Sequence, residues 1–288
     1  MAPRLPIVAA KPRLFDSLSH SRPTAAEALD GIRLRADGQP LSDAQLRERF
    51  ADRVAIVIPA YCEAENLVEL LPTLPGEIGG VPAATLVVDD GSSDDTDVVS
   101  ERAGATVAVL PGNRGGGAAL HAGYALMVQA GARVVISMDA DGQHRPEDLP
   151  LVAEPVLSGR ADLSAGSRTL GSAEPGAFAR ELGIAFFNRL VRVLTRKPVT
   201  DCSNSFRAIR TDVLPQLDLR QPQFHAAELL IEALTRGFRV EEVPVTVLRR
   251  QHGATKKPPT LRYGIGFSTA IASAWLRSLR RRRRLRAS

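Results

Sequence analysis

The sequence has few cysteines and histidines and no long apolar run, which are the features of disulfide frameworks, zinc sites and membrane spans. It contains only two cysteines, Cys62 and Cys202, with no C-x-x-C spacing and no histidine cluster beside either one. This scarcity disfavours a zinc site or a disulfide framework and favours a reducing compartment. No apolar run reaches the ~18–20 residues that a spanning helix requires, and the first residues lack the apolar core of a signal peptide. We therefore expect a cytoplasmic protein.

The excess of positive charge comes from the C-terminus. The net charge is +5, yet seven arginines lie between Arg277 and Arg286, so the rest of the chain is net acidic. This disfavours a nucleic-acid-binding function for the whole protein and leaves it only as an alternative for the arginine tail. With 288 residues, 44% of them hydrophobic, the chain can bury a large core.

Short apolar runs alternate with helical patterns through the first half of the chain. Strands are expected at 54–59, 85–89, 106–110, 134–138 and 161–168, with helices at 63–71 and, after a glycine-rich turn, up to residue 130. This alternation predicts an α/β fold with a mostly parallel, doubly wound sheet. We expect an N-terminal extension at 1–53 with short helices at 25–29 and 43–50, a single catalytic domain at 54–257, and a basic amphipathic tail at 258–288.

Polar side chains directly follow the strand expected at 134–138. Asp139, Asp141 and Gln143 alternate, and a chain that stayed extended would project all three to one side. Carboxylate and amide oxygens suit Mg²⁺ or Mn²⁺ better than zinc, so the three residues predict a divalent-metal site. For a D-x-D pattern alone, a simple polar exit from a strand is the alternative.

Other polar residues fall at the same predicted edge. Tyr61 and Glu63 follow the first strand of the domain, and Asp89 and Asp90 end the second. Ligands of parallel sheets gather at the carboxyl ends of the strands, which predicts one acidic site there. The glycine-rich turn at 112–123 fits neither a P-loop nor a dinucleotide fingerprint, and both close approach to a ligand and helix packing stay open for it.

Seven motifs appear in order between about residues 54 and 257. They are I-P-A-Y-C-E-A-E-N, V-V-D-D-G-S-S-D-D-T, N-R-G-G-G-A-A-L-H-A-G, D-A-D-G-Q-H-R-P-E, G-S-R, D-C-S-N-S-F-R and R-Q-H-G-A-T-K. In this order the chain resembles the family 2 glycosyltransferases with the Rossmann-like GT-A fold, and most closely the dolichyl/polyprenyl-phosphate mannose synthases. The nucleotide-binding set that this resemblance implies is Pro59, Tyr61, Glu63, Asp89, Asp90, Asp139 and Ala140.

The resemblance also implies the metal, catalytic and acceptor residues. Asp139, Asp141 and Gln143 would hold the cation on the donor diphosphate, and Arg250 and Lys256 would clamp that diphosphate from a loop in which Thr255 replaces the usual serine. The catalytic set is Asp141, Arg168, Arg207, Arg250 and Lys256. The acceptor-binding set is Arg168, Arg180, Ser203, Asn204 and Arg207. Two departures fall on the acceptor side: Ile184 stands where the family often has serine, and Asn204-Ser205 replaces Ser-Gly.

The expected activity is an inverting, metal-dependent transfer of a sugar from a nucleoside-diphosphate sugar to a polyprenyl-phosphate-type acceptor. Mannose and GDP are favoured by the resemblance. A lipid phosphate is already anionic and needs no base, whereas a hydroxyl acceptor does, and Asp201 is the only candidate base. The alternatives are a soluble metabolite or saccharide acceptor and a non-catalytic nucleotide-sugar-binding protein. Glu228 also matches the family, with a structural role as its alternative, and His144 and His225 are expected to be structural.

Two helical segments suggest contact with a membrane surface. The resemblance implies that the helix expected at 178–195 lies against the membrane; a core-facing helix is the alternative. In the C-terminal helix, we expect apolar residues to enter the headgroup boundary above the arginine run 280–284, on the anionic inner face of the membrane. These residues are Ile265, Phe267, Ile271, Trp275 and Leu276. A solvated basic end is the alternative, and the sequence carries no signal for an oligomeric state.

Overall fold

The computed structural model describes residues 24–173, 178–250, 252–253 and 260–287. The helices are α1 (Ala25–Leu29), α2 (Asp43–Phe50), α3 (Ala64–Leu70), α4 (Thr96–Arg102), α5 (Gly116–Ala130), α6 (Leu149–Leu157), α7 (Phe178–Thr195), α8 (His225–Arg236) and α9 (Thr260–Ala287). The strands are β1 (Arg33–Ala36), β2 (Gln39–Pro40), β3 (Val54–Ala60), β4 (Glu77–Ile78), β5 (Val81–Asp89), β6 (Thr106–Val109), β7 (Val134–Ser137), β8 (Leu163–Ala173), β9 (Arg207–Arg210) and β10 (Val240–Val247).

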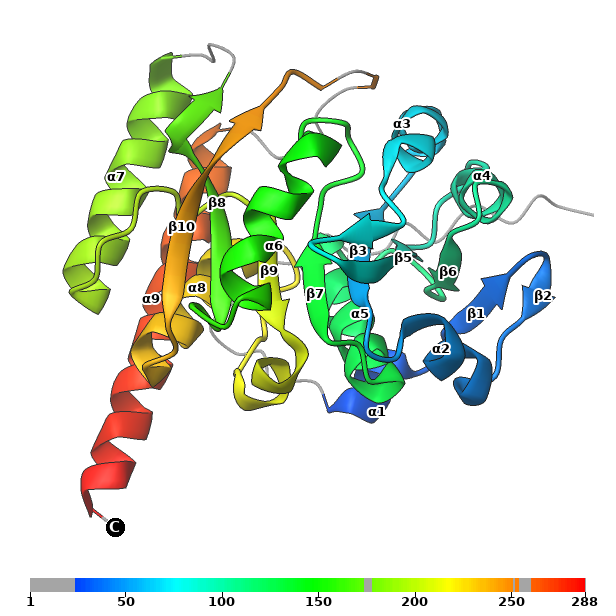
Figure 1. The fold of residues 1–288 in the computed structure, drawn as a ribbon. Coiled ribbons are helices and arrows are strands. Elements are labelled where there is room, and N and C mark those ends of the chain that lie inside the picture. The colour runs from blue at the N-terminus through cyan, green and yellow to red at the C-terminus, as the bar shows by residue number, and fades with distance from the viewer. Residues whose placement is uncertain (1–23, 174–177, 251, 254–259, 288) are drawn as a thin grey trace, which may run out of the picture.

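A single mixed sheet forms the centre of the protein, in the order β10-β8-β9-β7-β3-β5-β6-β1-β2 (Figure 1). β3 lies between β5 and β7 and is parallel to both, and β6 continues the parallel part beyond β5. β9 runs antiparallel between β7 and β8, and β10 is parallel to β8. The predicted α/β class with a mostly parallel sheet is therefore confirmed.

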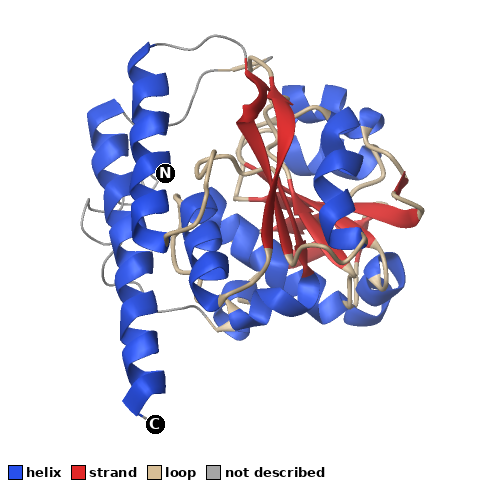
Figure 2. Cartoon of the chain, turned by 60° about the vertical axis from the view of Figure 1, so that its left-hand side comes forward, coloured by secondary structure: helices blue, strands red, loops and turns tan. Residues whose placement is uncertain are grey.

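Strand β3 shows why the sheet needs helices on both faces. Val54, Ile56 and Ile58 belong to the apolar cluster formed with α3 and α6, whereas Ala55 and Val57 belong to the cluster formed with α5 and α8. All five side chains are completely buried. A strand covered on both faces reads as a continuous apolar run, which is the pattern that the sequence shows. Figure 2 shows the resulting layers, with helices on either side of the strands.

Part of the expected N-terminal extension belongs to the sheet. β1 pairs antiparallel with β6, and Arg35 lies opposite Val107. The two short strands were not predicted, because R-L-R-A alternates polar and apolar residues over only four positions and Q-P is too short to show a pattern. The helices α1 and α2 begin and end at the predicted residues. In each, a serine or threonine N-cap forms a reciprocal capping box, with Glu27 in α1 and Gln45 in α2.

The C-terminal helix is packed against the protein more closely than expected. α9 lies along α8 and α7, and the side chains of Phe267 and Ile271 are buried in the main apolar cluster. The expectation that these two residues enter a membrane is therefore wrong. Trp275 donates its indole N–H to the carbonyl of Leu194 at 3.1 Å, which ties α9 to the end of α7. Only the last turns of α9 project beyond the other elements (Figure 1).

Candidate functional site

The acidic segment after β7 forms a tight turn. β7 ends at Ser137, and Gly142 has a φ of 72°, in the left-handed region that favours glycine. Asp141 Oδ1 accepts the backbone N–H of Gln143 at 3.2 Å. The expected extended geometry is wrong, but the turn keeps Asp141 close enough to Asp139 for their charges to interact. Burial raises the pKa of Asp141, and the charge of Asp139 raises it further.

These two carboxylates fit a divalent cation. A bound cation would offset both effects that disfavour the ionised form of Asp141. The side-chain nitrogen of Gln143 donates to the carbonyl of Leu248 at 2.9 Å, so the amide oxygen is left as the atom for other contacts. Among the described residues no group of three or more His, Cys, Asp or Glu side chains is arranged to hold a metal. A cation here would therefore need the amide oxygen of Gln143 or oxygens of a bound substrate to complete its coordination.

Arg250 links this turn to the nucleotide side of the site. Its guanidinium forms an ion pair with Glu63 and lies 3.5 Å from Asp141 Oδ2. Asn66 fixes this arrangement, because its amide donates to Glu63 Oε2 at 2.6 Å and accepts the backbone N–H of His252 at 3.1 Å. The predicted juxtaposition of Arg250 with the metal and nucleotide residues is thus present. Asn66 was not predicted, although the E-A-E-N motif contains it.

His144 is structural. Its Nδ1 accepts the backbone N–H of Asp139 at 3.2 Å, so Nε2 carries the proton that is shared with Asn204 Oδ1 at 3.0 Å. The buried ring stacks on Phe206 with a centroid distance of 4.8 Å. Asn204 in turn donates to the carbonyl of Gly166 at 2.9 Å. With both of its amide groups engaged, Asn204 supports the acidic turn from behind, and its predicted acceptor contact stays a prediction.

Asp89 and Asp90 end β5 and face different partners. Asp89 Oδ1 accepts the backbone N–H and the hydroxyl of Ser92, which closes the turn after the strand. The two oxygens of Asp90 accept the backbone N–H groups of Arg114 and Gly115, each at 2.7 Å. Burial raises the pKa of Asp90 to about 6 despite these two bonds. Asp90 therefore holds the glycine-rich turn, and its predicted nucleotide contact stays a prediction.

The glycine-rich turn packs against the protein itself. Gly117 donates its backbone N–H to the carbonyl of Pro222 at 2.7 Å, and a Cβ there would lie 2.2 Å from the carbonyl oxygen of Gln221. Gly115 has a φ of 97°, and its Cβ would lie 2.6 Å from the carbonyl oxygen of Pro222. Of the two interpretations that the sequence left open, these contacts support packing.

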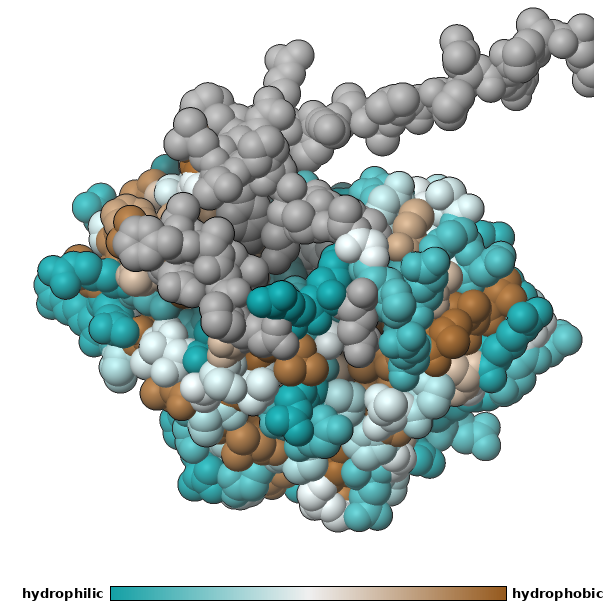
Figure 3. Space-filling model, turned by 90° about the horizontal axis from the view of Figure 1, so that it is seen from above, coloured by the Kyte–Doolittle hydropathy of each residue, from teal (hydrophilic) through white to brown (hydrophobic). Residues whose placement is uncertain are grey.

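The remaining nucleotide residues lie at the same edge of the sheet. Pro59 is the second-to-last residue of β3, and Tyr61 follows that strand and is 37% exposed. Ala140 is buried in the acidic turn. Figure 3 views the molecule from this end, and the surface that is visible around the grey atoms is largely hydrophilic with separate apolar patches. The carboxyl ends of β3, β5 and β7 thus bring the predicted donor residues to one edge.

Arg168 on β8 is more accessible than Arg207, the other arginine of the predicted acceptor set whose side chain the structure describes. Its Nε and Nη2 atoms donate to the two oxygens of Asp201 at 2.6 and 3.1 Å, and Nη2 also donates to Ser203 Oγ at 2.7 Å. The Asp201 side chain is fully buried, whereas 14% of the Arg168 side chain is exposed. Burial opposes ionisation of Asp201, but the hydrogen bonds and charge of Arg168 outweigh it and lower the pKa of Asp201. Asp201 is therefore a poor general base.

Arg207 has a different environment from the one expected. It is only 1% exposed, and its guanidinium donates to the backbone carbonyls of Asn204, Cys202 and Ala226. Burial lowers its pKa. In this conformation Arg207 cannot reach an acceptor, and its guanidinium instead holds the backbone around residues 202–204 in place.

Three predicted residues fall partly or wholly outside the described structure. Lys256 and Thr255 lie outside the described residues, and for Arg180 only the backbone within α7 is described. Ile184 lies in the same helix. The diphosphate clamp is thus described for Arg250 alone.

Glu228 is buried within the contact between α8 and α9. One oxygen accepts the backbone N–H groups of Arg220 and Gln221, each at 2.8 Å, and the other pairs with Arg277. One turn further on, Glu232 pairs with Arg281 at 3.2 Å. Two arginines of the predicted membrane tail therefore have partners inside the protein. Glu228 has a structural role, which is the alternative that the sequence left open.

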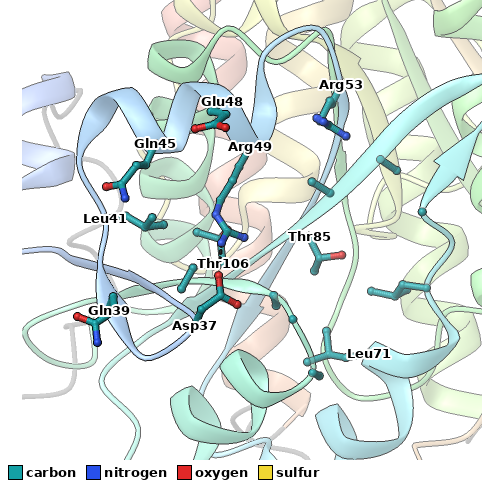
Figure 4. A pocket seen from close by; sticks show the side chains of 18 of the residues that line it. Asp37, Gln39, Leu41, Gln45, Glu48, Arg49, Arg53, Leu71, Thr85 and Thr106 are labelled. Atoms are coloured by element: carbon teal, nitrogen blue, oxygen red, sulfur yellow. Dashed lines mark hydrogen bonds and ion pairs between the residues drawn. The ribbon is translucent and has the colours of Figure 1, made fainter.

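A cavity of about 750 Å³ lies at the opposite end of the parallel strands (Figure 4). It is lined by the hairpin β1–β2, by α2 and by the starts of β5 and β6, with Thr85 and Thr106 on the strands. Its charged side chains balance: Arg49 pairs with Asp37, and Arg53 and Glu48 have opposite charges. This cavity contains none of the predicted site residues, and its position relative to the strands differs from that of the candidate site.

Within the described part of the chain, no helix combines the length and the apolar character needed to cross a bilayer. α9 is the longest described helix, but polar and basic residues interrupt it throughout.

Comparison with known proteins identifies the family. The family described as Glycosyl transferase family 2 matches residues 55–218. The polyprenol monophosphomannose synthase of Mycolicibacterium smegmatis is 32% identical over 222 residues, which cover 72% of this chain and 82% of the relative. The undecaprenyl-phosphate mannosyltransferase of Micrococcus luteus is 34% identical over 218 residues, which cover 71% and 87%.

A solved structure shares the fold. Glucosyl-3-phosphoglycerate synthase from Mycobacterium tuberculosis, in complex with Mn²⁺, UDP and glucosyl-3-phosphoglycerate, superposes with a TM-score of 0.62 at 22% identity, covering 83% of this chain and 84% of that one. The predicted resemblance is confirmed by the sequence relatives, and the predicted fold by this neighbour. The chain is a glycosyltransferase and belongs to glycosyltransferase family 2.

Proposed function

We propose that this enzyme transfers a sugar, preferentially mannose, from a nucleoside-diphosphate sugar to a polyprenyl-phosphate-type acceptor, with inversion at the anomeric carbon. The named activities of the two mannosyltransferase relatives support the acceptor class and the sugar. The neighbour with UDP and Mn²⁺ supports a nucleotide donor and a divalent cation, without distinguishing GDP from UDP for this chain.

On the donor side, the proposal relies on the residues gathered at the carboxyl ends of β3, β5 and β7. Asp139, Asp141 and the amide oxygen of Gln143 would hold the cation, which would neutralise the diphosphate as it leaves. Arg250 lies beside Asp141 and can contribute a second positive charge to the leaving group. Lys256 would complete this clamp.

One observation carries the choice of acceptor. Arg168 holds Asp201, the candidate base that the sequence offered, in a bidentate pair that keeps this carboxylate ionised and buried. A hydroxyl acceptor would have to lose its proton to another group, whereas a phosphate monoester attacks as an anion and needs none. The positive charge of Arg168, on a side chain that is partly exposed, suits such an anion. The site therefore favours a phosphate acceptor over a saccharide hydroxyl.

We further propose that the enzyme associates with an anionic membrane surface on its acceptor side. α7 exposes Leu182, Phe186 and Val193, which share one face because they are four and seven residues apart. α9 adds Ile265 and Leu276, which are also exposed. Ile265 and Leu276 are kept from the predicted set. Phe267 and Ile271 are removed because they are buried, and Trp275 is removed because its indole N–H binds the carbonyl of Leu194. An apolar face of this kind next to basic residues is typical of a helix that lies in the membrane interface.

The proposal is tested by transfer assays with GDP-mannose and UDP-glucose, Mn²⁺ or Mg²⁺, and three acceptors: undecaprenyl phosphate, 3-phosphoglycerate and a mannose disaccharide. We expect transfer to the lipid phosphate only, and calorimetry should show GDP binding more tightly than UDP. Transfer to 3-phosphoglycerate would establish the soluble-acceptor alternative. A UDP affinity at least tenfold tighter than that for GDP, a difference of about 1.4 kcal/mol, would overturn the preference for a guanine nucleotide.

A further inference from the structure

Residues 199–204 connect α7 to β9 and are held almost entirely by side chains. They form no helix or strand, and Asp201, Cys202 and Asn204 are buried. Buried peptide groups need hydrogen-bond partners, and here no sheet supplies them. The side chains that bond to the backbone of this segment are Thr169, Asn188, Arg192, Asp201, Arg207 and Glu242.

Glu242 on β10 holds the two peptides that precede the Asp201 side chain. Its carboxylate accepts the backbone N–H of Thr200 at 2.7 and 3.0 Å, and the backbone N–H of Asp201 at 2.9 Å. Both oxygens act as acceptors. A glutamine would place an N–H₂ group against one of these donors, so the contact specifically requires a carboxylate.

Asp201, whose backbone Glu242 holds, in turn binds Arg168. It binds Nε and Nη2 of the guanidinium in a fork and also accepts the backbone N–H of Arg168 at 3.2 Å. Because Asp201 is fully buried, it holds the guanidinium from the protein side, and the exposed part of Arg168 faces outward. The orientation of the Arg168 guanidinium is therefore set by the backbone of residues 200–201.

We propose that Glu242 is a positioning residue for acceptor binding: by fixing the peptides of Thr200 and Asp201, it sets the orientation in which Arg168 meets the acceptor phosphate. Glu242 itself touches no substrate. This inference rests on the proposed phosphate acceptor, and it gives a task to a residue that lies outside every predicted site.

The neighbouring residue provides a matched control. Glu241 is adjacent on the same strand, but its side chain forms a surface ion pair with Arg160 at 3.0 Å. We compare Glu242→Ala, Glu242→Gln and Glu241→Ala in the full-length enzyme, with a short-chain prenyl monophosphate as acceptor. Glu242→Ala should raise the acceptor KM at least tenfold and leave the donor Kd within twofold. The acceptor KM of Glu242→Gln should lie between those of Glu242→Ala and the wild type, and the acceptor KM of Glu241→Ala should match that of the wild type.

A double variant separates positioning from general stability. Arg168→Lys removes the planar fork that Asp201 orients but keeps the positive charge. Adding Glu242→Ala to Arg168→Lys should therefore raise the acceptor KM by less than twofold, although each change alone raises it strongly. If the two losses multiply, or if Glu242→Ala weakens donor and acceptor equally, Glu242 only stabilises the fold and the proposal is overturned.

A chemical measurement keeps the test independent of the transfer reaction. Phenylglyoxal modifies accessible, poorly paired arginines, and mass spectrometry gives the rate at Arg168. That rate should rise at least threefold in Glu242→Ala and stay unchanged in Glu241→Ala. If the wild type transfers no sugar to prenyl phosphate, the proposed function fails while this rate still decides whether Glu242 positions Arg168. Equal rates in all three proteins would refute the positioning.

Discussion

The proposed donor and acceptor sides of this enzyme are built differently. The donor residues follow directly after parallel strands, where the backbone alone brings Glu63, Asp89 and Asp139 to one edge. The acceptor side depends on residues 199–204, which are held by side chains from α7, β8, β9 and β10; Glu242 reaches Thr200 across 42 positions. A motif therefore predicts which donor-side residues meet at one edge, but on the acceptor side it does not predict which arginine keeps an exposed side chain.

Two arginines illustrate the difference. Arg168 and Arg207 both lie in motifs shared with the family, and both were predicted to bind the acceptor. Arg168 keeps an exposed edge and pairs with a carboxylate, whereas Arg207 is buried and donates to three carbonyls. The first arrangement presents a charge, and the second holds a loop together. If the two sides differ in this way, substitutions on the donor side should chiefly affect activity, and substitution of Arg207 should chiefly affect folding.

Asp141→Asn should cause the largest loss. We expect kcat/KM to fall more than 10³-fold, equivalent to about 4 kcal/mol, because the variant removes a carboxylate from the proposed metal pair. Burial and Asp139 disfavour the ionised Asp141, so its replacement by a neutral side chain should leave the melting temperature unchanged or higher. Excess EDTA should abolish activity of the wild type as well.

The matched control is Asp212→Asn, an exposed acid that pairs with Arg210 away from the site. It should keep full activity. Normal turnover in Asp141→Asn, or in the presence of excess EDTA, would show that the reaction does not use this pair to bind a metal.

Arg207→Met should chiefly affect folding. Three backbone carbonyls would lose a donor, which we expect to lower the free energy of unfolding by about 3–5 kcal/mol. Urea denaturation measures this, with Arg210→Met on the same strand as a control that should cost less than about 1 kcal/mol, because its side chain is 42% exposed. Wild-type stability combined with lost acceptor affinity would restore the predicted acceptor role of Arg207.

Local sequence patterns predicted some elements well, whereas contacts between segments distant in sequence could not be predicted. Continuous apolar runs predicted β3 and the segment that became β7, and α7 begins and ends at the predicted residues, because local patterns determine these elements. The acidic turn was found at the right place, but its shape depends on Gly142 and on contacts with Leu248. Glu242 was missed because its function depends on a partner segment distant in sequence. Phe267 was misplaced because an apolar helix face looks the same whether protein or lipid covers it.

Asp90 should make stability depend on pH. Its pKa is about 6 in the folded protein and near 3.8 when unfolded. A raised pKa gives stability that is fully present below pH 3.8 and is lost as the pH rises through about 6, up to about 3 kcal/mol. Asp90→Asn should flatten this decline between pH 4 and 7, as measured by denaturant titration, whereas the exposed Asp95→Asn should not. An unchanged slope in Asp90→Asn would assign the pH dependence to other groups.

The smallest effect concerns the surface beside the acceptor side, where α9 carries arginines of two kinds. Arg277 and Arg281 pair with Glu228 and Glu232, whereas Arg280 is exposed. A basic residue near an anionic membrane contributes roughly 1 kcal/mol, so Arg280→Gln should weaken binding of the full-length protein to phosphatidylserine vesicles about fivefold.

Arg281→Gln is the matched control for that variant, because it removes the same charge one residue away. Its guanidinium is engaged by Glu232, so the substitution should lower thermal stability and leave vesicle binding within twofold of the wild type. Co-sedimentation at low and high salt measures both proteins, and salt should reduce the difference between them because it screens the attraction. If the two variants lose vesicle binding equally, the ion pairs of α9 do not shield its arginines from the membrane. If the wild type stays in the supernatant at low salt, α9 is not a membrane contact, and the acceptor would have to reach Arg168 from solution.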